Sequence, residues 1–108
     1  MNSKVLTLLG FASKAGKLSY GFDAACSALN QKKSKLLLIA NNISSKSQKE
    51  ILFFGNKFKT EVFILEEYDI ETVSHAVGRR CGIISVNDTE FSRGLISAIN
   101  AGRNLNDK

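Results

Sequence analysis

The 108-residue sequence contains no proline, no tryptophan and only two cysteines. Because there is also no repeat and no low-complexity tract, nothing marks a linker inside the chain. We therefore expect a single domain over residues 1–101 and a polar C-terminal tail over residues 102–108. Cys26 and Cys81 do not have the spacing of metal ligands, which argues against a disulfide framework and a structural zinc site. Reduced thiols in a cytoplasmic protein are the expectation.

Long hydrophobic runs are missing as well. No apolar stretch approaches the ~20 residues that a membrane-spanning helix needs, so we expect no membrane partner. The apolar cluster between Met1 and Gly10 is short and follows Lys4. It predicts a helix of the mature protein and not a signal peptide.

Acidic residues are scarce in the first half of the chain. Residues 1–59 hold ten lysines against Asp23 and Glu50, a net charge of +8, whereas residues 60–108 have a net charge of −3. Such asymmetry favours a phosphate-rich partner such as a nucleic acid. A solvated lysine-rich surface explains the charge alone equally well.

Hydrophobic spacing and turn residues predict alternating helices and strands. The order α-β-α-β-α-β-α-β-α predicts an α/β fold: a three-layer α/β/α sandwich around a mixed sheet of about four strands, with residues 35–40 as the central strand. The expected strands cover 18–20, 35–40, 61–65 and 82–86. The expected helices cover 3–15, 22–31, a segment with Ile51, Phe54 and Phe58 capped by Ser44 or Ser45, a segment from Ile70 to Gly78, and a segment with Phe91, Leu95, Ile96 and Ile99 capped by Asp88.

Cysteine and histidine are present without a catalytic arrangement. Cys26 lies on the apolar face of its predicted helix, Cys81 precedes a strand without a motif, and His75 has no carboxylate at a diagnostic spacing. We therefore expect no catalytic residue and no enzymatic activity.

Metal and cofactor motifs are also missing. The acidic run Glu66, Glu67, Asp69 and Glu71 lacks a calcium-loop pattern and fits a solvated loop. The eight glycines form neither GxGxxG nor GxxxxGK[ST]. The sequence thus predicts no metal and no cofactor.

Gly21 stands at a predicted strand-to-helix turn, between one group of lysines and another. The free N–H groups at the start of the following helix can receive a phosphate, and nearby lysines add a long-range field. A helix cap beside a solvated lysine run is the other interpretation. The lysines in question are Lys14 and Lys17 before the turn and Lys32, Lys33 and Lys35 after it.

The same region carries a family resemblance. Residues 8–44, LLGFASKAGKLSYGFDAACSALNQKKSKLLLIANNIS, resemble without a gap the bacterial YlxQ-type proteins of the kink-turn-binding superfamily that includes ribosomal proteins L-seven-Ae and L-thirty-e. Residues 76–80 (AVGRR) and 83–88 (IISVND), with Phe91, resemble later segments of the family pattern. The resemblance covers nearly the whole chain before the tail.

This resemblance implies the same sandwich fold and a ribosomal-protein-like, non-enzymatic function in binding kink-turn or similarly bent RNA. Ribosomal RNA, transfer RNA and riboswitches are the implied contexts, with ribosome association and a monomeric state. Only in bent RNA does an opened major groove expose base edges to side chains. The implied RNA-binding residues are Gly21, Phe22, Asp23, Ala24 and Ser27 for close contact; Leu65, Glu66 and Glu67 for a flipped-out nucleotide; and Lys17, Lys32, Lys33 and Lys35 for phosphate attraction.

The sequence also departs from the family pattern. Relatives often have lysine where Ser27 stands, Glu or Gln where Ala24 stands, and glycine where Lys32 and Ser74 stand; their Val-Pro pair is replaced by residues 60–61 (TE). The missing lysine and the acidic residues after position 65 leave a second hypothesis open. In it the chain is a protein-interaction module that keeps the fold and binds RNA weakly or without specificity.

Overall fold

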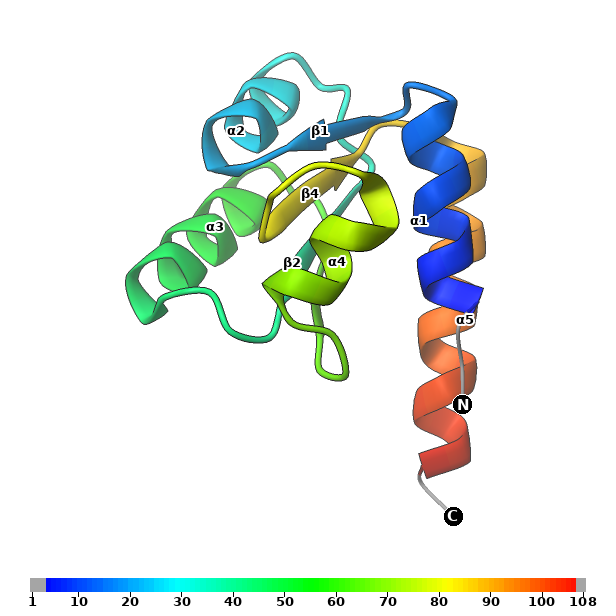
Figure 1. Ribbon diagram of the computed structural model, residues 1–108. Coiled ribbons are helices and arrows are strands. Elements are labelled where there is room, and N and C mark those ends of the chain that lie inside the picture. The colour runs from blue at the N-terminus through cyan, green and yellow to red at the C-terminus, as the bar shows by residue number, and fades with distance from the viewer. Residues whose placement is uncertain (1–3, 107–108) are drawn as a thin grey trace.

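The computed structural model describes residues 4–106, with side chains described from 4 to 102. This part of the chain forms five helices and four strands in strict alternation (Figure 1). In chain order they are α1 (Lys4–Lys14), β1 (Leu18–Tyr20), α2 (Phe22–Asn30), β2 (Leu36–Ala40), α3 (Ser45–Lys57), β3 (Val62–Leu65), α4 (Ile70–Val77), β4 (Ile83–Val86) and α5 (Thr89–Asn106).

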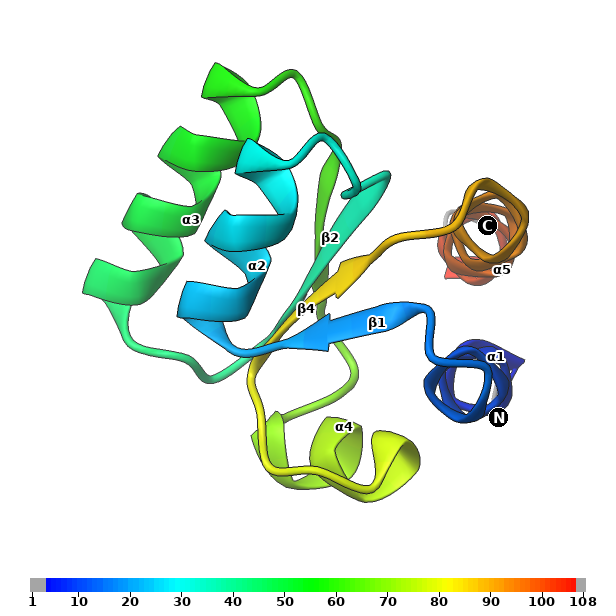
Figure 2. The ribbon, with the colours of Figure 1, turned by 90° about the horizontal axis from the view of Figure 1, so that it is seen from above.

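The four strands form one mixed sheet with the order β1-β4-β2-β3. Strand β4 pairs antiparallel with both β1 and β2, and β2 pairs parallel with β3. Figure 2 shows α2 and α3 on one side of the sheet and α1 and α5 on the other, and α4 contributes Val73 and Val77 to the core on the side of α1 and α5. The predicted three-layer sandwich with a mixed, four-stranded sheet is confirmed, and β2 is an interior strand as expected.

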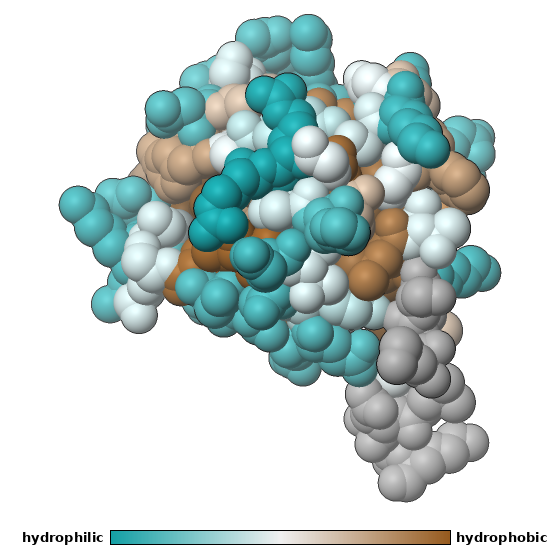
Figure 3. Space-filling model, in the orientation of Figure 1, coloured by the Kyte–Doolittle hydropathy of each residue, from teal (hydrophilic) through white to brown (hydrophobic). Residues whose placement is uncertain are grey.

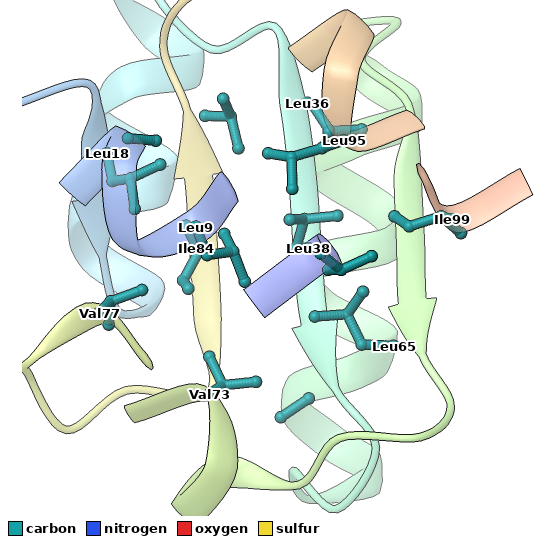
Figure 4. Close-up of a cluster of buried hydrophobic side chains, with 14 of the residues drawn as sticks. Leu9, Leu18, Leu36, Leu38, Leu65, Val73, Val77, Ile84, Leu95 and Ile99 are labelled. Atoms are coloured by element: carbon teal, nitrogen blue, oxygen red, sulfur yellow. The ribbon is translucent and has the colours of Figure 1, made fainter. Parts of the chain in front are cut away.

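Alternation along the inner strands builds one core on each side of the sheet. Leu36 and Leu38 pack with the layer of α1, α4 and α5, whereas Leu37 and Ile39 pack with α2 and α3. All five residues of β2 are buried, as a strand covered on both faces requires. Figure 4 shows the larger core, in which leucines, isoleucines and valines from helices and strands meet.

Polar side chains cap the starts of three helices, two of them, α3 and α5, where the sequence predicts a cap. Ser44 caps α3 by accepting a hydrogen bond from the Ser47 N–H (3.1 Å). Of the two predicted candidates, Ser44 and Ser45, the cap is therefore Ser44. Asp69 accepts from the Thr72 N–H and Asp88 from the Phe91 N–H, both at 2.8 Å. These contacts satisfy N–H groups that a helix leaves without partners.

Two helices are followed by a lysine at a position where glycine is usual. Lys32 after α2 and Lys59 after α3 have φ of 61° and 57°, in the left-handed region. In each case the lysine N–H and the next N–H bond back to the last turn, the arrangement of a Schellman motif. A side chain in this conformation costs roughly 1 kcal/mol relative to glycine. Glycine, which the family resemblance leads us to expect at position 32, adopts this conformation without that cost.

The final helix is longer than the sequence suggests. Helix α5 continues to Asn106, so the expected start of a polar tail at residue 102 lies inside the helix, and residues 107–108 lie outside the described residues. Within residues 4–106, no helix combines the length and the apolar character needed to cross a bilayer.

Candidate nucleic-acid interface

The turn between β1 and α2 leaves the start of a helix open. Gly21 has φ 93° and ψ 168°, a backbone conformation that is essentially restricted to glycine. Its N–H donates to the Ile83 carbonyl (2.8 Å), and its own carbonyl accepts from the Ala25 N–H (3.0 Å). Because Gly21 has no side chain to cap α2, the N–H groups of the first helical turn can bind an acceptor from outside. A Cβ at this position would meet nothing within 4 Å, so space for that acceptor is free.

One exposed face of α2 continues from this turn. Asp23 and Ser27 are exposed and one helical turn apart, and Phe22 and Ala24 are partly exposed at the start of the same helix. The Ser27 hydroxyl accepts a hydrogen bond from the Gln31 side-chain amide (2.9 Å). The structure therefore brings together Gly21 and the four α2 residues that the sequence singled out.

Two further loops lie beside the Gly21 turn, because β4 is inserted between β1 and β2. The chain enters β4 next to the end of β1 (Figure 2), and the Ala40 N–H donates to the Gly82 carbonyl (2.8 Å). A hollow of about 280 Å³ lies among Gly21, Phe22, Gly82 and the loop of residues 42–44. A Cβ on Gly82 would approach the Ile43 Cγ2 atom to 2.6 Å, so glycine is needed there for packing.

Arg79 is a basic residue at this end that the sequence analysis did not place in the site. Its guanidinium lies 4.7 Å from the centre of the Tyr20 ring, next to Gly21. The Tyr20 hydroxyl is hydrogen-bonded to Ser13, whose hydroxyl donates to the Val77 carbonyl (2.8 Å), so the ring that supports Arg79 is fixed. Arg79 is exposed and can interact with phosphate. The adjacent arginine pair at 79–80, next to a glycine, is the sequence signal for it.

The predicted lysines lie at the opposite end of α2. The Lys17 carbonyl accepts from Asn87 and the Lys35 N–H donates to Val86, both beyond the far end of β4. Lys32 and Lys33 follow the last residue of α2, and all four lysines are exposed. Because α2 has nine residues, this lysine group lies about 13 Å from the Gly21 turn. The basic field and the open helix start are therefore two separate parts of one side of the molecule.

The predicted second loop lies at the same end of the sheet as the Gly21 turn but at the other edge, because β1 and β3 run in the same direction on either side of β4 and β2. Leu65 is 4% exposed and packs in the larger core, so its side chain cannot cover a nucleotide, which corrects that expectation. Glu66 and Glu67 are exposed but follow β3, at the sheet edge opposite β1. With β4 and β2 in between, they lie about three strand spacings, roughly 14 Å, from Gly21.

The two cysteine thiols are partly or fully buried, as is usual for cysteines without a catalytic role. Burial, together with the carboxylates of Asp23 and Glu50, raises the pKa of the Cys26 thiol. Burial also raises the pKa of Cys81, against an opposing effect of Arg79. Both thiols therefore stay protonated and weakly nucleophilic near neutral pH. Among residues 4–106, no three His, Cys, Asp or Glu side chains are grouped closely enough to hold a metal ion.

Comparison with known sequences gives an independent finding. The family model described as Ribosomal protein L7Ae/L30e/S12e/Gadd45 family matches residues 3–95. The large ribosomal subunit protein eL30 of Dictyostelium discoideum is 30% identical over 95 residues, which cover 86% of this chain and 83% of that protein. The RNA-binding protein YlxQ of Enterococcus faecium is 22% identical over 90 residues, which cover 83% of this chain and 85% of that protein.

Solved structures show the same fold. A protein of unknown function from Bacillus halodurans C superposes with a TM-score of 0.86 at 24% identity, covering 91% of this chain and 98% of that one. The Giardia lamblia 15.5kD RNA binding protein superposes with a TM-score of 0.74 at 11% identity, covering 91% and 83% of the two chains.

Proposed function

Since this chain belongs to the ribosomal protein L7Ae/L30e/S12e/Gadd45 family, we propose that it is a non-enzymatic, ribosomal-type RNA-binding protein that recognises kink-turn or similarly bent RNA. The observation that carries the proposal is the uncapped start of α2 at Gly21, with an exposed helical face behind it and Arg79 beside it. The name of the YlxQ relative, an RNA-binding protein, supports it.

The chemistry of this helix start suits a bent RNA better than a duplex. Free N–H groups at the first turn of α2 donate to phosphate or base oxygens, and the Asp23 carboxylate accepts from base amino groups. In an A-form duplex the major groove is too deep and narrow for a helix to reach these edges. A sharp bend opens the groove, so Gly21, Phe22, Asp23, Ala24 and Ser27 can enter it.

The lysines at the other end of α2 have a different part in this proposal. Lys17, Lys32, Lys33 and Lys35 attract the phosphates of the stem that continues from the bend, at a distance of about 13 Å along α2. Phosphate contacts orient the RNA but carry little sequence information. Glu66 and Glu67 lie at the other sheet edge and have no contact assigned to them here.

The proposed partners rest on the membership of this family. Ribosomal RNA, transfer RNA and riboswitches contain structured bends, and a cytoplasmic, monomeric protein associated with the ribosome is the form in which we expect this chain to act.

A gel-shift comparison of a kink-turn stem-loop with a perfect duplex of equal length tests the proposal. We expect tighter binding to the kink-turn at matched salt. Gly21→Ala should remove this preference, because alanine disfavours the backbone conformation that opens the helix start. Gly16→Ala is the matched control, since Gly16 also has positive φ (72°) and free space around it. Equal affinities of the unaltered protein for both RNAs contradict the proposal and favour the protein-interaction module.

A further inference from the structure

The outer surface of α3 carries a stripe of three lysines and one phenylalanine. Lys46, Lys49, Phe53 and Lys57 are spaced by three, four and four residues, which places them on one face of the helix. All four are exposed, and Phe53, at 62%, is the most exposed large hydrophobic side chain among the described residues. We call these four residues the α3 stripe. Figure 3 shows apolar residues interspersed with hydrophilic ones on the side of the molecule where α3 lies.

A row of aromatic rings connects this stripe to the start of α2. Phe53 and Phe54 are in edge-to-face contact at 5.4 Å between ring centres, and Phe54 contacts Phe22 in the same manner at 6.2 Å. Phe22 directly follows Gly21. A hollow of about 360 Å³ is lined by these three rings together with Lys49 and Glu50. An RNA bound at the Gly21 turn would therefore have this aromatic surface next to it.

The composition of the α3 stripe selects an unpaired nucleic acid strand. The exposed face of an aromatic ring stacks on the face of a base, and lysines around it neutralise phosphates. Base faces are free only in unpaired nucleotides, because stacking covers them in a duplex. Glu50 is the single acidic residue of α3, so the stripe is positive and would repel an identical stripe of a second copy.

We propose that the α3 stripe binds a single-stranded RNA segment adjacent to the bend, with a base stacked on Phe53 and phosphates held by Lys46, Lys49 and Lys57. This rests on the proposed function only for the position of the bend. The stripe and the aromatic row would bind an unpaired strand without it.

Binding to three RNAs distinguishes the α3-stripe proposal from the proposed kink-turn recognition. They are a kink-turn with blunt ends, the same kink-turn with about eight unpaired nucleotides added to one strand, and the unpaired strand alone. We expect the extension to raise the affinity of the unaltered protein about tenfold. Phe53→Ala should remove most of this gain, because the three lysines keep only their phosphate contacts, and should leave the affinity for the blunt kink-turn unchanged. Phe11→Ala is the matched control, because Phe11 is 56% exposed on α1, in the opposite layer.

The absence of tryptophan provides a second readout. Phe53→Trp adds the only indole, whose fluorescence a stacked base changes. We expect a change with the extended kink-turn and with the unpaired strand, and none with the blunt kink-turn.

Each result has a definite consequence. An equal gain from the extension in the Phe53→Ala protein, or no fluorescence change, overturns the inference. If Phe53→Ala instead abolishes a self-association measured by sedimentation and leaves all RNA affinities unchanged, the stripe is a contact between copies and the inference is wrong. If the kink-turn is not preferred over duplex but the unpaired strand still requires Phe53, the proposed function fails and the α3 stripe remains a binding site.

Discussion

Ser27 is the α2 residue at which a single substitution separates base recognition from simple charge attraction. Its side chain is exposed on the same face as Asp23, and its hydroxyl is engaged by Gln31. Serine is too short to reach far into a groove, whereas a lysine there can reach guanine acceptors. We expect Ser27→Lys to raise the affinity for a kink-turn by about 1–3 kcal/mol more than the affinity for plain duplex. Calorimetric titration against both RNAs measures the difference.

A lysine introduced on the opposite side of the molecule controls for the added positive charge of Ser27→Lys. Asn100 is exposed on α5, in the layer opposite α2, so Asn100→Lys changes the net charge equally without approaching the proposed groove. An equal gain for both RNAs from Ser27→Lys, or no gain for the kink-turn, would show that α2 does not enter the groove.

Leu65 and Arg79 illustrate which residues of the site a sequence can identify. Gly21 to Ser27 form a local unit, so their grouping follows from one turn and one helix. Leu65 belongs to the buried side of β3, and the strand end alone does not show which side chain faces the core. Arg79 lies beside Tyr20 because β4 is inserted next to β1, a contact between segments about 60 residues apart in the chain. No local pattern contains that information.

Helix α5 and helix α3 each contain a glycine, and their surroundings predict opposite effects of the same substitution. A Cβ on Gly94 in α5 would lie 3.6 Å from the Leu8 Cδ1 atom, an ordinary contact. We expect Gly94→Ala to stabilise the protein by about 0.5–1 kcal/mol, since alanine loses less backbone entropy in a helix. A Cβ on Gly55 in α3 would lie 2.5 Å from Val62 Cγ2 and 3.3 Å from the Thr60 carbonyl. We expect Gly55→Ala to destabilise by about 1–3 kcal/mol, because the stiff valine cannot move aside.

Urea unfolding of the two variants measures both changes in the free energy of unfolding. Similar shifts of the same sign would mean that the spacing between α3 and β3 does not limit the side chain at position 55.

The Asp69 side chain that caps α4 makes the stability of the fold depend on pH. The hydrogen bond from the Thr72 N–H lowers the pKa of the Asp69 carboxyl. A carboxylate whose folded-state pKa is lowered stabilises the fold above the unfolded pKa, and this stabilisation is lost as pH falls through the folded value. We expect Asp69→Ala to be less stable than the unaltered protein at neutral pH, with the difference disappearing in acid. Thermal unfolding at several pH values measures it, and a difference independent of pH would contradict a role for the charge.

The helices and strands themselves could be predicted because their signals are local. Ser44, Asp69, Asp88 and Gly78 mark helix ends through bonds and backbone angles within four residues. The strand order depends on contacts between distant segments, which is why the sequence could predict a mixed sheet but not which loops share an end. The extension of α5 through Asn106 was missed because its polar residues lack a hydrophobic period beyond Ile99.

At the scale of the whole molecule, the salt dependence of RNA affinity tests whether the uneven charge contributes to binding. If lysines attract phosphates, log K for RNA should fall with log salt by about 0.7–0.9 per neutralised phosphate. We expect Lys33→Glu combined with Lys35→Glu to weaken kink-turn and duplex binding alike and to reduce this slope. Lys4→Glu combined with Arg93→Glu, on the opposite helical layer, changes the charge equally and should leave the slope nearly unchanged.

Filter binding at several salt concentrations measures the slopes. A loss confined to one RNA would assign Lys33 and Lys35 to base recognition, and a flat salt response would favour a protein partner.

The position of β4 also sets the order in which the molecule can be completed during translation. Among the four strands of residues 4–106, β4 is the last to be synthesised, yet it lies between β1 and β2. Until residues 83–86 have left the ribosome, both earlier strands have an unpaired edge and the Gly21 N–H has no Ile83 carbonyl to bind. A nascent chain therefore cannot close this sheet before residues 83–86 have been made. Closure of the sheet and the hydrogen bond from the Gly21 N–H to the Ile83 carbonyl are therefore late events in the synthesis of residues 4–106.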